Sequence, residues 1–282
     1  MIVSVSRRCD IPRFKFDWFM ERLNEGFAEA VNPFNAAQIK RIPLVPVKEG
    51  MKPEDGTDVF VFWTRDPKHI LANTDELKER GFPFYVMVSV TGYPEALEPN
   101  QASILDVIKS MKELSLKIGS ERVIWRYDPV ILTSITDDKF HRRSFKNISE
   151  ELSGFVDRVI ISIFDKYQGA MKRLSALEKE GKFVIQDNDI NNSSFHGIIS
   201  GLYECAMEAK MEIQSCAEKI DFQSMGINIK RGACIDAALI EKICGVQTVR
   251  DKNQRADCLC CKSVDIGTYN TCAAHCVYCY AW

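Results

Sequence analysis

The chain has 282 residues, of which 46% are hydrophobic and 27% charged, and its formal net charge is −2. This composition excludes a disordered, collagen-like or low-complexity chain. It contains no apolar run of about 18 residues that would span a membrane, and the mixed charge gives no general case for nucleic-acid binding. The arginines near the N-terminus follow a short apolar stretch instead of preceding it, unlike a signal peptide, so we expect a cytoplasmic protein.

Apolar strand-like runs alternate with helical patterns along most of the chain. In chain order, the predicted strands are residues 2–6, 28–32, 59–63, 84–91, 122–126, 158–164 and 212–216. The predicted helices are residues 16–25, 68–80, 103–117, 145–155, 167–180 and 197–210, and a short strand–helix pair follows at 226–229 and 237–243. Strands separated by helices predict an α/β fold with a parallel sheet, because parallel strands need crossover connections.

About eight such units fit a closed (β/α)8 barrel of the TIM type over residues 1–245. An open, doubly wound sheet is the alternative, because periodicity does not show whether a sheet closes. From residue 246 onward, polar residues and cysteines replace the strand–helix rhythm. We therefore expect a second region, residues 246–282, to be a cysteine-rich tail that packs on the barrel and is held by metal.

Charged residues follow several predicted strands. In barrels of this kind the functional site lies at the carboxyl ends of the strands, so these residues should meet at one mouth. The arginines would hold a small anionic substrate or cofactor, and three of the acids would move protons. The alternative is that these residues form Arg–Asp pairs that only brace loops. The arginines are Arg7, Arg8, Arg65 and Arg126, the proton-moving acids are Asp10, Asp128 and Glu218, and Asp165 lies at the same edge.

The chain has eleven cysteines, and six of them lie between residues 258 and 279. Dense cysteines in a cytosolic protein are typical of metal ligands. Cys272, Cys276 and Cys279 have the spacing C-x3-C-x2-C, which can hold a 4Fe-4S cluster. Three protein ligands would leave one iron open to a small molecule such as S-adenosylmethionine. A zinc site completed by His275 or another cysteine is the alternative.

A second set of cysteines combines residues from two predicted regions. Cys258 and Cys260 lie in the tail, whereas Cys216 and Cys234 directly follow predicted strands. Four thiolates would complete a closed site, either a second iron–sulfur cluster or a structural zinc. Alternatively, Cys216 and Cys234 are only small buried residues. The three remaining cysteines considered, Cys9, Cys205 and Cys244, are predicted to serve packing.

Several motifs resemble a known family. They are residues 6–12 (SRRCDIP), 32–35 (NPFN), 61–64 (VFWT), 91–93 (TGY), 125–129 (WRYDP), 216–218 (CAE) and 265–272 (DIGTYNTC). Over essentially the whole chain the sequence is similar to the uncharacterised prokaryotic domain-of-unknown-function family eighteen forty-eight. That family is noted for C-terminal cysteines similar to the radical-SAM cluster motif and has no established reaction. The resemblance therefore implies an architecture and a cofactor, but no substrate.

The order of the parts differs from the broad radical-SAM pattern, in which the cysteine motif precedes the barrel. Two functions remain open. The first is a radical-SAM-like enzyme that acts on a small molecule in the barrel mouth and takes electrons from a reductant protein. The second is a non-catalytic or electron-transfer protein that binds iron–sulfur clusters or zinc. A zinc hydrolase is a weaker third possibility, because only four histidines are present.

Overall fold

The computed structural model describes residues 1–33, 35–187 and 193–282; Phe34 of the NPFN motif therefore lies outside the described residues. The strands are β1 (Ile2–Val5), β2 (Phe27–Asn32), β3 (Asn35–Pro43), β4 (Val59–Thr64), β5 (Phe84–Ser89), β6 (Val123–Val130), β7 (Arg158–Ile163), β8 (Glu212–Cys216), β9 (Lys230–Gly232) and β10 (Val264–Asp265). The helices are α1 (Ile11–Phe14), α2 (Phe16–Glu25), α3 (Lys68–Ala72), α4 (Thr74–Glu79), α5 (Ile104–Ile118), α6 (Asp138–Leu152), α7 (Gln168–Lys179), α8 (Ser193–Glu208) and α9 (Ala237–Cys244), with short 3-10 turns at Pro53–Asp55 and Ser120–Arg122.

Eight strands form one sheet in the order β10-β1-β4-β5-β6-β7-β8-β9, and all the pairs between them are parallel. From β1 to β9 the spatial order follows the chain order, without the reversal that defines a doubly wound sheet. The α/β prediction with a large parallel sheet is thus confirmed. Within the described residues, β9 and β10 pair with their inner neighbours and not with each other.

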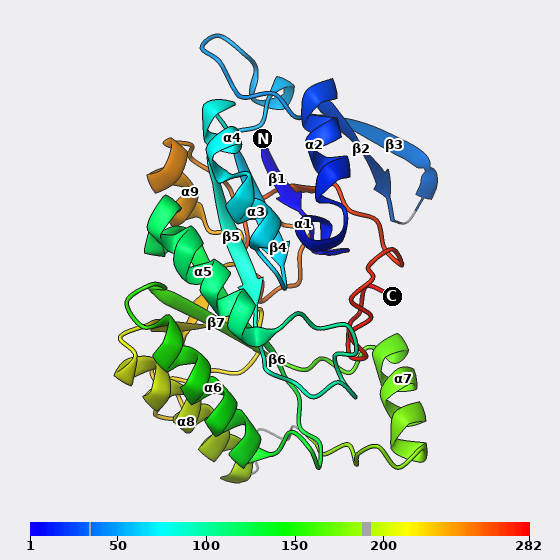
Figure 1. Ribbon diagram of the computed structural model, residues 1–282, viewed down its shortest axis with the longest axis vertical. Helices are drawn as coiled ribbons and strands as arrows, with labels where there is room; N and C mark the ends of the chain where they lie inside the picture. Colours follow the sequence, from blue (N-terminus) through cyan, green and yellow to red (C-terminus); the bar gives the residue numbers. More distant parts are fainter. Residues whose placement is uncertain (34, 188–192) are drawn as a thin grey trace.

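One predicted strand does not belong to this sheet. The segment predicted as residues 28–32 forms β2, which pairs antiparallel with β3 in a separate two-stranded sheet (Figure 1). The connection between β2 and β3 is far too short for a crossover, so the two strands form a hairpin. The eighth strand of the large sheet comes instead from the tail, where β10 pairs with β1.

Alternating residues of the central strands pack against two different layers. In β4, Phe60 and Phe62 join the core that also contains residues of α2, α5, α6 and α8. Val61 and Trp63 point to the opposite face, where α9 and the tail cysteines Cys258, Cys260 and Cys261 cover the sheet. Because both faces are covered, the strands are almost continuously apolar. Apolar contacts and strand pairing therefore hold the tail on the sheet.

Other element boundaries differ from the sequence prediction in small ways. The helix predicted over 68–80 is divided into α3 and α4 at Asn73. Helix α6 begins earlier than predicted, because the Asp137 side chain caps it by accepting a hydrogen bond from the Phe140 N–H at 2.9 Å. In place of the strand predicted at 226–229, β9 forms directly after that segment, over Lys230–Gly232. In the described part of the chain, no helix has the length and apolar character needed to cross a bilayer.

Candidate metal and ligand sites

The three C-terminal thiols lie on one closed loop. The Asn270 N–H donates to the Ala281 carbonyl at 2.8 Å and joins the two ends of the loop. Asn270 and His275 have φ values of 60° and 50°, so the chain turns through the left-handed region twice. This compact path brings Cys272 and Cys279 close enough to help raise the pKa of Cys276, and Cys272 close enough to help raise that of Cys279.

Burial raises the pKa of all three thiols, and that of Cys276 to about 12. Without a metal these groups are protonated at neutral pH, so metal binding must displace protons. The Ala281 N–H points at the Cys279 sulfur at 3.3 Å. Such N–H donors stabilise a thiolate, and they tune iron–sulfur clusters.

Two half-buried arginines hold this loop in place. Arg173 of α7 donates to the backbone carbonyls of Val277, Cys279 and Trp282, and in Figure 1 the C-terminal segment lies between α7 and the region of α1 and β1. Arg65, at the end of β4, pairs with Glu98 and also donates to Tyr278 Oη at 3.2 Å. Arg65, predicted to bind an anion, is thus already paired with Glu98 and hydrogen-bonded to Tyr278.

The four thiols of the second set come from the ends of β8 and β9 and from the tail. The sulfurs of Cys216, the last residue of β8, and Cys234, just after β9, lie 3.1 Å apart. Cys260 interacts with the thiols of both Cys234 and Cys258. These hydrogen bonds, together with an N–H bond from Ile235 at 3.4 Å, lower the pKa of Cys260 and favour its thiolate. The structure therefore brings all four predicted cysteines together.

Among the described residues, no three His, Cys, Asp or Glu side chains stand in the arrangement that a bound metal ion requires. In a tetrahedral site with metal–sulfur bonds of about 2.3 Å, the sulfurs are about 3.8 Å apart. Cys216 and Cys234 would therefore separate slightly to share a metal. Cys261 faces elsewhere, with its sulfur 2.9 Å from Thr248 Oγ1.

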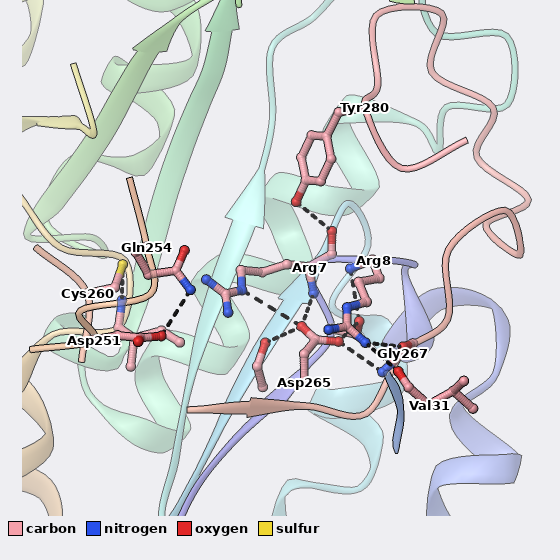
Figure 2. Close-up of polar contacts among 12 residues, drawn as sticks. Arg7, Arg8, Val31, Asp251, Gln254, Cys260, Asp265, Gly267 and Tyr280 are labelled. Carbon is pink, nitrogen blue, oxygen red and sulfur yellow. Dashed lines mark hydrogen bonds and ion pairs between the residues drawn. The ribbon is translucent and has the colours of Figure 1, made fainter. Parts of the chain in front are cut away.

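Arg7 and Arg8 are neighbours in sequence but their side chains are directed to opposite sides (Figure 2). Arg8 donates to the carbonyls of Val31 and Gly267, at 3.4 and 3.3 Å, and its guanidinium lies over the Tyr269 ring. Arg7 extends toward Cys260, and this thiol is among the groups that raise the Arg7 pKa. The side chains of these two arginines, both predicted to bind an anion, therefore point to different places.

Asp265 of β10 fixes the backbone between them. Its Oδ2 accepts hydrogen bonds from Ser4 Oγ at 2.7 Å and from the Arg7 N–H at 2.8 Å. Its Oδ1 accepts from Ser6 Oγ at 2.5 Å and from the Gly267 N–H at 2.9 Å. Sequence reasoning missed this role, although Asp265 belongs to the family motif that precedes the cysteines.

Arg126 of β6 faces the four-thiol set and pairs with Asp128, which also accepts from Ser162 Oγ. Its guanidinium carbon lies 4.8 Å from the centre of the Trp63 ring. Sequence reasoning also missed Trp63, Glu98 and Arg173 as site residues, since nothing in their local patterns marks them. Arg126 and Asp128 contact each other within β6, which continues to Val130 and so extends beyond the predicted strand at 122–126.

Two of the other predicted acids, Asp10 and Glu218, accept hydrogen bonds from backbone N–H groups. Asp10 caps α1 by accepting from the Arg13 N–H and also accepts from the Arg65 N–H, at 3.1 and 2.8 Å; burial raises its pKa to about 6. Glu218 accepts from the Ile163 N–H at 2.7 Å, and burial raises its pKa to about 7. Asp165 forms an exposed ion pair with Arg255.

These features define an α/β protein with a parallel eight-stranded sheet and two groups of cysteines, one on the face of the sheet that carries Val61 and Trp63 (hereafter the inner face) and one on the C-terminal loop. The chain belongs to the domain of unknown function family DUF1848, whose sequence model matches residues 2–281. A comparison with curated proteins finds no match.

Proposed function

We propose that this chain is an iron–sulfur protein and an enzyme of the radical-SAM type, in which Cys272, Cys276 and Cys279 hold a 4Fe-4S cluster. The observation that carries the proposal is that all three cysteines lie on one loop, whose ends are joined by the hydrogen bond between Asn270 and Ala281. The loop contacts residues that follow β1, β4 and β5, because Tyr280 Oη donates to the Arg7 carbonyl and the Val277 N–H to the Leu97 carbonyl, both at 3.0 Å. It therefore lies at the carboxyl edge of the sheet, where barrel enzymes place their sites.

The donor chemistry fits such a group. The loop supplies three thiols, and thiolates are the ligands that iron–sulfur clusters use. With three protein ligands, one iron stays open for S-adenosylmethionine, and the bound cluster would supply the electron for its reductive cleavage. The chain's own residues hold the loop: Arg173 binds its carbonyls and Tyr278 is anchored on Glu98.

Cys216, Cys234, Cys258 and Cys260 would form a separate, closed site for a second cluster or a zinc ion. The four residues come from the ends of β8 and β9 and from the tail, so a metal here would fix the tail to the inner face of the sheet. Because consecutive strands lie side by side from β1 to β9, we further propose that the sheet is a (β/α)8-type barrel closed by the tail. The cytoplasm would keep these thiols reduced.

The substrate would be a small anion held near Arg7 and Arg126, with a reductant protein supplying electrons. Asp128, beside Arg126, is the nearest of the proposed proton-transfer groups to that position. Asp10 and Glu218, with pKa values of about 6 and 7, can exchange protons near neutral pH. Arg8 and Arg65 would act mainly by bracing the loops around this mouth.

The test is the iron and sulfide content of protein made with iron and purified without oxygen. About four irons per chain indicate one cubane cluster and about eight indicate two. Cys276→Ala should lose one cluster and keep the fold, whereas Cys205→Ala, a matched change on α8, should keep all the iron. Stoichiometric zinc without iron would replace this proposal with the zinc-binding alternative.

A further inference from the structure

Two buried hydrogen-bond donors, one on Trp63 and one on Arg126, have no acceptor among the described residues. The Trp63 residue is 7% exposed, and its Nε1–H finds no partner among residues 1–33, 35–187 and 193–282. The same is true of the Nε–H of Arg126, whose guanidinium lies over the Trp63 ring. Buried donors are nearly always paired, so two orphans on side chains in contact indicate a missing acceptor.

A third donor group lies over the same indole. The guanidinium carbon of Arg7 is 5.9 Å from the ring centre of Trp63. Its nearest carboxylate, Asp265, stands 3.8 Å away, beyond hydrogen-bond distance. The reason is that Asp265 already accepts four hydrogen bonds from neutral groups, which fills its lone-pair sites. In Figure 2 the Arg7 guanidinium extends past Asp265 toward Gln254 and Cys260.

The position of these donors suits a ligand. Arg7 follows β1, Trp63 belongs to β4 and Arg126 to β6, so the three groups lie on the inner face near the carboxyl ends of strands. Arg126 uses Nη2 to bind Asp128, and its Nε–H has no acceptor among the described residues. The Arg7 side chain is 23% exposed, so the group has a solvent-accessible edge.

We propose that Arg7, Trp63 and Arg126 form a binding site for an oxyanion, a carboxylate or phosphate group of the substrate. Two guanidinium groups and an indole N–H provide both the charge and the directed donors that such a group needs. The inference rests on the proposed function only in calling the ligand a substrate, since anion binding itself requires no metal. It assigns Trp63 as a binding residue, and it leaves Arg8 and Arg65 out of the site because protein groups already engage them.

The thiols offer a competing explanation for the orphan donors. Arg126 lies close enough to Cys216 and Cys234 to affect their charge. In the described part of the chain, however, neither Trp63 Nε1 nor Arg126 Nε reaches a sulfur atom at hydrogen-bond distance. The donors therefore fit an external acceptor better than the thiols.

The experiment is calorimetric titration of the anaerobically prepared protein with inorganic phosphate and, separately, with malonate. We expect one of the two to bind once per chain, which also distinguishes a phosphate from a carboxylate ligand. Trp63→Phe keeps the ring and removes the donor, and Arg126→Lys keeps the charge and removes Nε; each should weaken binding about tenfold or more. Trp18→Phe and Arg80→Lys, matched changes on α2 and after α4, should bind as the wild type does.

Three results would overturn the inference: neither anion binds, both site variants bind like the wild type, or the site variants lose metal while anion binding is unchanged. The last result would mean that the donors serve the thiols. Iron content measured on the same samples separates the two proposals, because the anion can bind without iron, and iron can be present without anion binding.

Discussion

Replacing Arg65 with methionine tests whether this arginine holds the C-terminal loop. The Glu98 side chain is 1% exposed, and one of its oxygens accepts hydrogen bonds from Arg65, Thr91 and Tyr278. Arg65→Met leaves that carboxylate buried without its cation. Breaking a buried pair in this way costs about 3–5 kcal/mol, a large part of a typical total of about 5–15 kcal/mol.

Urea denaturation of single and double variants measures this cost. Arg65→Met combined with Glu98→Met removes both charges and should recover much of the loss, because apolar replacement of a whole buried pair is close to neutral. Arg80→Met breaks the exposed pair with Glu76 and should cost about 0–1 kcal/mol. The reasoning fails if Arg65→Met costs no more than Arg80→Met, or if the double variant is as unstable as the sum of its parts.

Three other predictions concern pH, packing and the thiols. His141 is buried beside Tyr127, and burial lowers its pKa from 6.5 to about 4. The free energy of unfolding should therefore fall by about 3 kcal/mol as the pH drops from 6.5 to 4, because the buried ring resists protonation. In His141→Gln, the free energy of unfolding should depend less on pH over this range. Gly267→Ala should destabilise the β1–β10 contact because the new Cβ would stand 1.9 Å from Ser6 Oγ, whereas Gly169→Ala meets nothing closer than 3.5 Å and should melt like the wild type. Cys234→Ala should make the tail sensitive to limited proteolysis, and equal cleavage of variant and wild type would show that the thiols do not hold it.

The sequence predicts most of the parallel sheet because its buried strands are apolar runs with no polar face. It fails at β2, where a run that contains the exposed Glu29 forms a hairpin whose pairing depends on β3. It also fails at β10, since Val264 and Asp265 are too short a segment for periodicity to detect. Tertiary contacts decided both outcomes.

Part of the site was also accessible to sequence reasoning. Cysteine spacing predicted two thiol groups; the structure places Cys216, Cys234, Cys258 and Cys260 in contact, and it places Cys272, Cys276 and Cys279 on one loop. The arginines were less predictable, because Arg7 and Arg8 follow the same strand and differ only in which acceptors the fold places near them. The roles of Glu98 and Trp63 come from burial, which no local pattern of these residues indicates.

The pairing of β1 with β10 also has a consequence for folding. Ser4 and Asp265, which hydrogen-bond across it, are 261 positions apart, and such distant contacts form slowly because a long loop must close first. Until that happens the edge of β1 is open and the cysteine loop, which follows β10, is not yet held beside it. The thiols are therefore exposed to oxidation for as long as the nascent chain lacks this final contact, and chaperones or reducing conditions should improve the yield of correctly folded protein.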